Sequence, residues 1–214
     1  MPLRHLTGSA AFRYVDLEVG PGVFVPRPET ELLAGWAIDS ARELGSDRPP
    51  VVVELCAGSG AISLSIIHEL PAAKVHAVEL DEVAYGWARR NLDGTGVDLR
   101  LGDMADAFSD LDGQVDVVVA NPPYIPLDAW ESVAPEARDH DPQLALWSGD
   151  DGLDAMRVLE QVAWRLLRPG GVVGAEHAAA QGESAPAVFT GRWAEVRDHL
   201  DLAERPRFVT ARRP

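Results

Sequence analysis

Short apolar runs and amphipathic segments alternate along the chain from residue 51 onward. Runs such as VVVEL at 51–55 are almost continuously apolar, which is typical of a parallel strand covered on both faces. Segments such as AISLSIIHEL at 61–70 fit a helix between two strands. This alternation predicts an α/β domain with a largely parallel sheet, which binds its ligands beyond the carboxyl ends of the strands.

The same pattern predicts the other elements. Helices are expected at 30–44, with Thr30 as the cap and Gly45 as the end, and at 61–70, 81–94 and 152–168, where Pro169-Gly170-Gly171 stops the last one. Strands are expected at 51–55, 74–80, 97–103, 115–121 and 172–177. Two more strands at 194–213 surround a turn at 204–206, and alternating positions at 15–19 predict a half-buried strand near the start.

Composition limits the class of protein only broadly. The 214 residues, of which 46% are hydrophobic and 25% charged, are ordinary for one globular domain. No apolar run approaches the roughly 18 residues of a membrane span, and the start lacks the apolar core of a signal peptide. A single cysteine, Cys56, excludes an internal disulfide. We therefore expect a cytoplasmic protein.

The net charge of −15 argues against a broad, sequence-independent grip on nucleic acid, which needs lysine and arginine to displace counterions. It permits a basic protein partner through electrostatic steering, and it equally fits a protein whose acidity only keeps it in solution.

A glycine-rich turn follows the strand at 51–55. Gly58 and Gly60 allow a tight turn and a close approach of a ligand to the backbone, and the free N–H groups of the next helix attract negative charge. Glu79 closes the second strand, where a carboxylate can accept hydrogen bonds from the two hydroxyls of a ribose. The turn alone is weak evidence, but together with Glu79 it predicts a ligand that carries adenosine.

The turn fits S-adenosyl-methionine better than a dinucleotide. A dinucleotide site requires G-x-G-x-x-G, and the third glycine is absent, which disfavours a nicotinamide dehydrogenase. Glu54 would repel a pyrophosphate but suits a ligand with an ammonium group. At the end of the third strand, Met104 can cover an adenine face. Asp103 beside it either contacts the adenine or caps a loop.

The segment Asn121-Pro122-Pro123-Tyr124 ends the fourth strand. The Asn121 amide oxygen and the Pro122 carbonyl can both accept hydrogen bonds, so together they suit a planar NH2 group. The prolines fix the backbone before a substrate arrives, and Tyr124 offers a flat face. The alternative, a turn that merely ends a strand, is weakened by the glycine turn and Glu79. We expect methyl transfer to a positioned nitrogen, without a dedicated strong base.

At this point the chain resembles the HemK/PrmC release-factor glutamine methyltransferases. VFVPRPETELL at 23–33 is very similar to the family's most specific segment, VVELCAGSGAISLSI at 52–66 resembles its cofactor motif, and NPPYIP at 121–126 matches its catalytic motif. PLRHLTGSAAF at 2–12 and DPQLALWSGDDGLDAMRVL at 141–159 resemble its hairpin and a later insert, so the resemblance covers nearly the whole chain. Asn-Pro-Pro-Tyr also occurs in adenine methyltransferases, which makes the other segments more discriminating.

The resemblance implies a Rossmann-like class I S-adenosyl-methionine-dependent methyltransferase, with a seven-stranded, mostly parallel sheet after a short hairpin. Residues 1–48 would form a hairpin and helix linker region, and residues 49–214 the methyltransferase domain. The implied reaction methylates the side-chain amide nitrogen, N5, of the glutamine in the Gly-Gly-Gln motif of class I peptide chain release factors, and leaves S-adenosyl-L-homocysteine. No membrane and no direct nucleic-acid contact are implied, and a monomer is expected.

The resemblance also implies the site residues. The catalytic residues would be Asn121, Pro122 and Tyr124, and these together with Pro123 and Phe24 would bind the substrate. The cofactor would contact Glu54, Cys56, Ala57, Gly58, Ser59, Gly60, Glu79, Asp103, Met104 and Asn121. An Arg27/Glu29 pair would shape the pocket or simply brace a linker. His177 is expected to be structural, and no metal set is evident.

The chain departs from the family at a few positions. Glu54 stands where aspartate is common, Cys56-Ala57 where Gly-Thr is common, and Ala178 where glycine often follows. Family members usually begin with a small helical domain that helps to dock the release factor, whereas Met1-Pro2 directly precede the hairpin segment. Three other functions stay open: methylation of adenine amines in nucleic acid after base flipping, methylation of a ribosomal-protein glutamine, and a non-catalytic cofactor-binding module.

Overall fold

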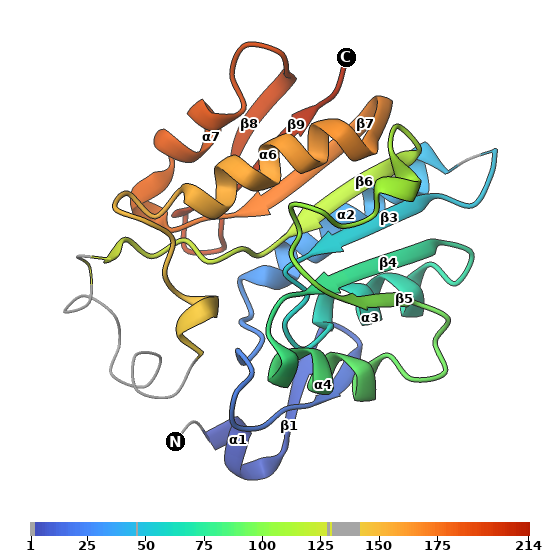
Figure 1. Ribbon diagram of the computed structural model, residues 1–214, viewed down its shortest axis with the longest axis vertical. Helices are drawn as coiled ribbons and strands as arrows, with labels where there is room; N and C mark the ends of the chain where they lie inside the picture. Colours follow the sequence, from blue (N-terminus) through green and yellow to red (C-terminus); the bar gives the residue numbers. More distant parts are fainter. Residues whose placement is uncertain (1–2, 46, 128, 130–141) are drawn as a thin grey trace.

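The structure is a computed structural model that describes residues 3–45, 47–127, 129 and 142–214 (Figure 1). Seven strands form one sheet in the order β5-β4-β3-β6-β7-β9-β8. Their bounds are β3 Val51–Leu55, β4 Lys74–Glu79, β5 Asp98–Leu101, β6 Val115–Ala120, β7 Leu167–Glu176, β8 Ala194–Leu200 and β9 Pro206–Arg212. The strands from β5 to β7 pair in parallel, and β9 lies antiparallel between β7 and β8. The predicted seven-stranded, mostly parallel sheet is confirmed.

The strand order reverses at β3. The chain runs from β3 outward through β4 to β5, and then returns to place β6 on the other side of β3. The carboxyl ends of β3 and β6 therefore lie side by side while their following loops diverge, which opens a crevice for a ligand. Both strands are deeply buried, as their apolar sequences predict.

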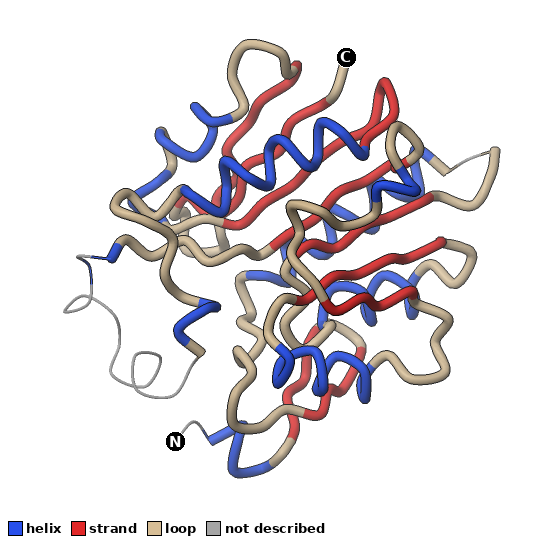
Figure 2. Tube along the Cα trace, in the orientation of Figure 1, coloured by secondary structure: helices blue, strands red, loops and turns tan. Residues whose placement is uncertain are grey.

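Helices cover both faces of the sheet (Figure 2). One face packs against α2 (Thr30–Leu44) and α3 (Ala61–Glu69), with α4 (Glu82–Asn91) at its margin. The other packs against α6 (Asp154–Leu166) and α7 (Ser184–Val188). Gly174 lets α2 approach β7, because any side chain there would meet the Trp36 ring of α2.

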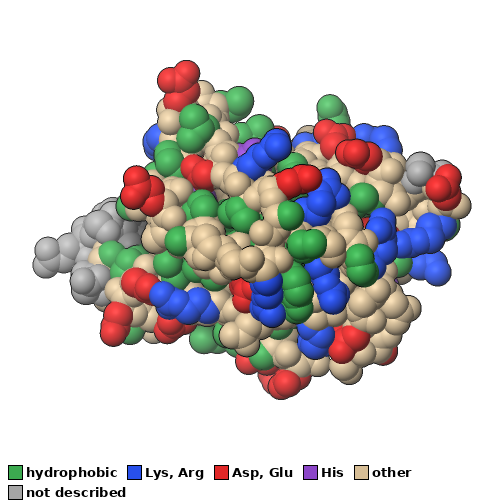
Figure 3. All heavy atoms as spheres, turned by 90° about the horizontal axis from the view of Figure 1, so that it is seen from above, with side chains coloured by type: hydrophobic (Ala, Val, Ile, Leu, Met, Phe, Trp, Pro, Cys, Tyr) green, Lys and Arg blue, Asp and Glu red, His purple; other side chains and the backbone are tan. Residues whose placement is uncertain are grey.

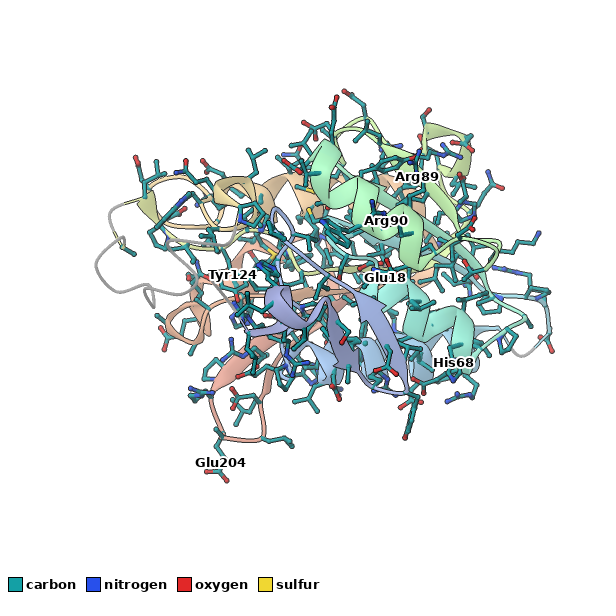
Figure 4. The ribbon with its side chains drawn as sticks, turned by 90° about the horizontal axis from the view of Figure 1, so that it is seen from below. Glu18, His68, Arg89, Arg90, Tyr124 and Glu204 are labelled. Carbon is teal, nitrogen blue, oxygen red and sulfur yellow. The ribbon has the colours of Figure 1, made fainter. Side chains whose placement is uncertain are left out.

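A short N-terminal unit precedes the sheet. It consists of α1 (Leu3–Thr7) and a hairpin of β1 (Ser9–Phe12) and β2 (Val15–Glu18), of which the resemblance implies the hairpin. The hairpin lies against α4, and Figure 4 labels Glu18 on β2 and Arg90 on the neighbouring helix. Asn91 of α4 joins the hairpin to the loop after β3. Its side chain accepts from the Glu18 N–H and donates to the Glu18 carbonyl, and it also donates to the Ser59 carbonyl at 2.9 Å. The division of the chain at residues 48 and 49 stays a prediction.

Some local expectations are corrected. Thr30 does not cap α2, because the helix begins at Thr30 and the cap position is Glu29. The Thr30 hydroxyl instead donates to the carboxylate of Glu176, which is distant in the sequence. α6 ends at Leu166, and residues 169–171 lie inside β7, where the pairing with β6 shifts register. The sequence patterns did not predict α1 or α7, which have five residues each. Within the described ranges no helix has the length and apolarity to cross a membrane.

Candidate active site

One cavity of about 570 Å³ lies at the carboxyl ends of the central strands. The glycine turn after β3, the end of β4 and the loop after β5 form one side of it. The segment after β6 and the stretch before α2 form the other. The cavity therefore occupies the crevice that the strand order creates.

The glycine turn depends on backbone conformations that suit glycine. Gly58 has φ +57° and Gly60 has φ +81°, both in the left-handed region. A hydrogen bond to β4 holds the turn in place, because Ala57 N–H donates to the Val78 carbonyl at 3.0 Å. Cys56 adopts φ 59° as well, which is uncommon for a residue with a side chain. The turn is thus held rigidly against the end of β4.

Glu79 joins this turn to the start of α4. Its Oε2 accepts from Gly58 N–H at 2.7 Å, and its Oε1 accepts from Asp81 N–H at 2.9 Å. Burial raises the pKa of this carboxyl, while the backbone hydrogen bonds oppose the rise. A carboxylate oxygen has more than one acceptor site, so Glu79 can still accept from hydroxyl groups of a ligand.

Glu54 is a buried carboxyl in the wall of the cavity. Its Oε2 accepts from Ser63 N–H at 2.9 Å and from the Ser63 hydroxyl. Burial raises the pKa of Glu54 to about 8, although both bonds from Ser63 favour the charged form. A cationic group in the cavity would stabilise the carboxylate and lower this pKa again.

The loop after β5 contributes one polar and one soft apolar group. Asp103 Oδ1 accepts from Ala105 N–H at 2.9 Å, so this carboxylate caps the loop and also lines the cavity. Met104 Sδ lies 3.7 Å from Cys56 Sγ, and the two sulfur atoms form one apolar patch of wall. Burial raises the pKa of the Cys56 thiol, which keeps it a neutral, weakly reactive group.

The Asn-Pro-Pro-Tyr segment is anchored by the chain that follows residue 141. Ile125 N–H donates to the Leu146 carbonyl at 2.8 Å, and Ser148 N–H donates to the Ile125 carbonyl at 2.9 Å. Gln181 Nε2 donates to the Tyr124 carbonyl at 3.0 Å. Because the prolines already restrict the segment, these bonds leave it little freedom.

Two side chains of this segment make polar contacts beneath the cavity. Asn121 Nδ2 donates to Thr30 Oγ1 at 3.4 Å, and the Tyr124 hydroxyl donates to Glu176 Oε1 at 3.3 Å. Burial raises the pKa of Tyr124, so it stays a neutral phenol (labelled in Figure 4).

The structure brings most of the predicted site residues to this cavity. Those in its lining are Phe24, Glu54, Cys56, Ala57, Gly58, Ser59, Glu79, Asp103, Met104, Asn121, Pro123 and Tyr124. Two others are not among the lining residues: Gly60 leads into α3, and Pro122 is buried. The Arg27 guanidinium lies 4.8 Å from the centre of the Phe24 ring, and Glu29 lies 3.9 Å from Arg205.

Sequence reasoning missed Thr30, Glu176 and Gln181. For Glu176 the available signal is its position as a carboxylate at the end of a buried strand, directly before His177. His177 bonds Asp198 Oδ1 and the Ala178 carbonyl, both at 2.9 Å, which is a structural role. In the described part of the chain, no group of three or more His, Cys, Asp or Glu residues has the arrangement of a metal site. Asp141, the first residue of the later insert, lies outside the described residues.

Comparison with known proteins places this geometry in context. Residues 41–134 match the family model "Methyltransferase small domain". The chain is 62% identical over 214 residues to a release factor glutamine methyltransferase of Streptomyces coelicolor, covering 99% of this chain and 76% of the relative. It is 46% identical to the Mycolicibacterium smegmatis protein of the same description, covering 100% of this chain and 75% of the relative. It is also 46% identical to a 4-amino-L-phenylalanine/4-methylamino-L-phenylalanine methyltransferase of Streptomyces pristinaespiralis, covering 91% of this chain and 68% of the relative.

Solved structures support the fold. TrmN from Thermus thermophilus superposes with a TM-score of 0.57 at 21% identity, covering 83% of this chain and 48% of that chain. Precorrin-6y C5,15-methyltransferase from Geobacter metallireducens superposes with a TM-score of 0.57 at 15% identity, covering 86% and 89%. At these identities the likeness concerns the fold alone.

Proposed function

The chain belongs to the release factor glutamine methyltransferase family, and from that membership we propose its reaction: methyl transfer from S-adenosyl-L-methionine to N5 of the glutamine in the Gly-Gly-Gln motif of class I peptide chain release factors. The observation that carries the proposal is the placement of the Asn-Pro-Pro-Tyr segment and the glycine turn on one cavity. We assign the protein to the cytoplasm, where its substrates act, and expect a monomer.

The residues of the cavity fit this cofactor. The buried carboxyl of Glu54 would pair with the ammonium group, and Glu79 would accept from the ribose hydroxyls. The backbone from Cys56 to Gly60 would follow the amino-acid end, with Asp103 and Met104 beside the adenine. When bound, the cofactor supplies a methyl group on a positively charged sulfur, which is a good leaving group.

The Asn-Pro-Pro-Tyr segment would hold the acceptor nitrogen. Asn121 Oδ1 would accept one N–H of the glutamine amide and the Pro122 carbonyl the other, although Pro122 is not itself part of the cavity lining. Tyr124 and Phe24, which do line the cavity, would contact the plane of the amide. Because the prolines restrict the segment before a substrate arrives, the amide nitrogen would be oriented without a strong base. The amide nitrogen held by these acceptors would take the methyl group that the cofactor supplies, and the proton that this nitrogen loses would pass to water.

The charge of the protein favours a protein substrate over nucleic acid. The net charge is −15, and the face in Figure 3 carries basic and acidic side chains interspersed, without a continuous basic surface. Such a surface gives little counterion release on a phosphate backbone. We therefore propose that the chain makes no direct contact with nucleic acid and that release factors are its partners.

A second acceptor has a specific observation in its favour. The Streptomyces pristinaespiralis relative is described as a 4-amino-L-phenylalanine/4-methylamino-L-phenylalanine methyltransferase, and its identity to this chain, 46%, equals that of the Mycolicibacterium protein. An aromatic amine is also a planar NH2 group that needs two acceptors. An aromatic amine of an amino acid is thus the alternative acceptor.

The test is to incubate the protein with methyl-labelled cofactor and a purified class I release factor, or with 4-amino-L-phenylalanine. We expect label on the Gly-Gly-Gln glutamine, and none when that glutamine is replaced by alanine. Label on the free amino acid but not on the release factor would select the second acceptor. Label that persists on the altered release factor would contradict the assigned glutamine.

Asn121→Ala serves as the matched variant in this assay. We expect kcat to fall on the order of 10²–10³-fold, as for the loss of other preorganised polar groups at a reacting centre. Cofactor affinity, measured by calorimetry, should stay close to that of the unaltered protein. Equal losses in both quantities would count against the acceptor role of Asn121.

A further inference from the structure

We propose that Thr30 and Glu176 form a hydrogen-bond relay that sets which end of the Asn121 amide faces the substrate. The inference rests on the proposed function, since it explains how Asn121 presents an acceptor rather than a donor. Thr30 and Glu176 are positioning residues in this account, because they act through Asn121.

The relay joins three parts of the fold. Thr30, the first residue of α2, donates from Oγ1 to Glu176 Oε2 at 2.7 Å, across 146 positions of sequence. Glu176 is the last residue of β7. Asn121, directly after β6, donates from Nδ2 to the same Thr30 oxygen at 3.4 Å. The last distance is long, so the contact is the weakest of the relay.

The direction of the relay follows from counting protons. When Glu176 is ionised, its carboxylate can only accept, so the single hydroxyl proton of Thr30 goes to Glu176. The Thr30 oxygen then has only lone pairs to offer its other neighbour, which must be a donor. The NH2 end of the Asn121 amide is therefore drawn to Thr30, and the amide oxygen is left to face the cavity.

This selection matters because an asparagine amide is nearly symmetric in shape. Its oxygen and nitrogen ends differ little in size, so packing alone does not choose between two orientations related by a flip. With the NH2 end toward the cavity, the side chain would oppose the N–H groups of the acceptor. The relay removes that unproductive orientation.

Burial makes the relay selective. Thr30 is 5% exposed and Glu176 is 1% exposed, so water is a poor substitute for either partner. The second Glu176 oxygen accepts a hydrogen bond from the Tyr124 hydroxyl at 3.3 Å. Each of the two carboxylate oxygens therefore faces a hydrogen-bond donor. Burial and Glu29 raise the pKa of Glu176 to about 7, although Thr30, Arg207 and Tyr124 favour its charged form. The relay therefore acts above that pH, where Glu176 is ionised.

The primary test is a double-mutant cycle with Thr30→Val and Asn121→Asp at pH 8, where Glu176 is ionised. Valine keeps the shape of threonine but lacks the hydroxyl, and we expect kcat to fall by roughly 10- to 100-fold, as for a misplaced catalytic group. Aspartate has two oxygen ends, so it needs no orientation, and Thr30→Val should cost no further activity in Asn121→Asp. Thr30→Ser keeps the hydroxyl and should stay close to the unaltered protein. Equal losses in both backgrounds would overturn the relay.

Two further measurements distinguish loss of the relay from two other causes of low activity, which are a general loss of packing and the choice of a wrong substrate. Cofactor affinity should not change in Thr30→Val, whereas a general loss of packing around the cavity would lower it. The side-chain amide resonances of Asn121, assigned by their absence in Asn121→Asp, should shift in Thr30→Val and in Glu176→Gln but not in Thr30→Ser. This NMR comparison needs no acceptor, so it stands even if release factors are not methylated. Unchanged Asn121 resonances in Thr30→Val would refute the relay.

Discussion

Three carboxyls at or near strand ends lie in or near the wall of the cavity: the buried Glu54 in β3 and Glu176 in β7, and the half-buried Glu79 in β4. Burial raises the pKa of each one, and each accepts hydrogen bonds from neighbouring N–H or O–H groups. Glu79 and Glu176 use these bonds to hold the turn and the relay. Glu54 differs, because it lines the cavity and a cation bound there would stabilise its ionised form.

The role of Glu54 predicts that cofactor binding releases a proton. With a pKa of about 8, Glu54 is mostly protonated at pH 7 in the free protein, whereas an ammonium partner would hold it ionised. The ammonium of the ligand is already mostly charged at that pH. Calorimetry of S-adenosyl-homocysteine in two buffers with different ionisation enthalpies should show the release.

Two controls locate this proton. Methylthioadenosine carries the ribose and adenine but no ammonium, so its binding should release markedly less. Glu54→Gln should abolish the difference between the two ligands. If methylthioadenosine released as much as S-adenosyl-homocysteine, the proton would come from another group, and Glu79 would be the first candidate.

Among the secondary-structure elements, α2 and β7 determine the geometry beneath the cavity. α2 carries Thr30 at its first residue, and β7 carries Glu176 at its last. The two elements approach closely where Gly174 lies under Trp36, two residues before Glu176. The close approach at Gly174 thus supports the hydrogen bond between Thr30 and Glu176.

Gly174→Ala should therefore lower the free energy of unfolding. The added methyl would overlap the Trp36 ring, and overpacking of this kind costs typically about 1–3 kcal/mol. Gly86→Ala is the matched control, since it lies within α4 with no atom near the new methyl, and it should raise the free energy of unfolding by about 0.5–1 kcal/mol. Denaturant unfolding measures both, and a neutral Gly174→Ala would show that α2 can shift.

The sequence predicted elements well where the pattern is local. The apolar runs of β3 and β6 and the glycine turn required no knowledge of the fold, because burial and positive φ leave direct traces in residue type. Thr30 was misread as a cap because its real partner lies 146 positions away. Residues 169–171 were misread as a helix stop because only the pairing with β6 reveals them as part of β7.

The candidate site was predictable to a similar extent. Asn121 and Glu79 were proposed because each follows or ends a predicted strand. Glu176 has the same kind of position, but its strand was not recognised as part of the site. Gln181, which fixes the Tyr124 carbonyl, lies in a short turn with no periodic pattern. Contacts made across the sheet were therefore the part that sequence could not supply.

For the whole molecule, the raised pKa values predict how stability depends on pH. Folded Glu54 and Glu176 keep their protons up to about pH 8 and 7, whereas both groups in the unfolded chain release them near the ordinary pKa of 4.5. Between these limits the folded state binds more protons, so the free energy of unfolding should fall as pH rises from about 5 to 8.

Denaturant unfolding across that pH range checks this expectation. The net charge of −15 acts in the same direction through self-repulsion, but added salt screens it and leaves buried groups little affected. At high salt the slope should persist in the unaltered protein and flatten in the Glu54→Gln, Glu176→Gln double variant. A slope that vanished with salt alone would assign it to surface charge.

The place of β9 has a consequence for how the protein is made. β9 lies between β7 and β8 but follows both in the chain, and Phe208 of β9 pairs with Glu176. During synthesis, β7 therefore has one edge without a partner strand, and β8 has no partner strand at all, until residue 212 of β9 has been synthesised. Vectorial folding from the first strand can assemble β3 to β7, but it cannot enclose Glu176. The site should thus mature only after synthesis of β9, and nascent chains that stall earlier would expose an unpaired strand edge to aggregation.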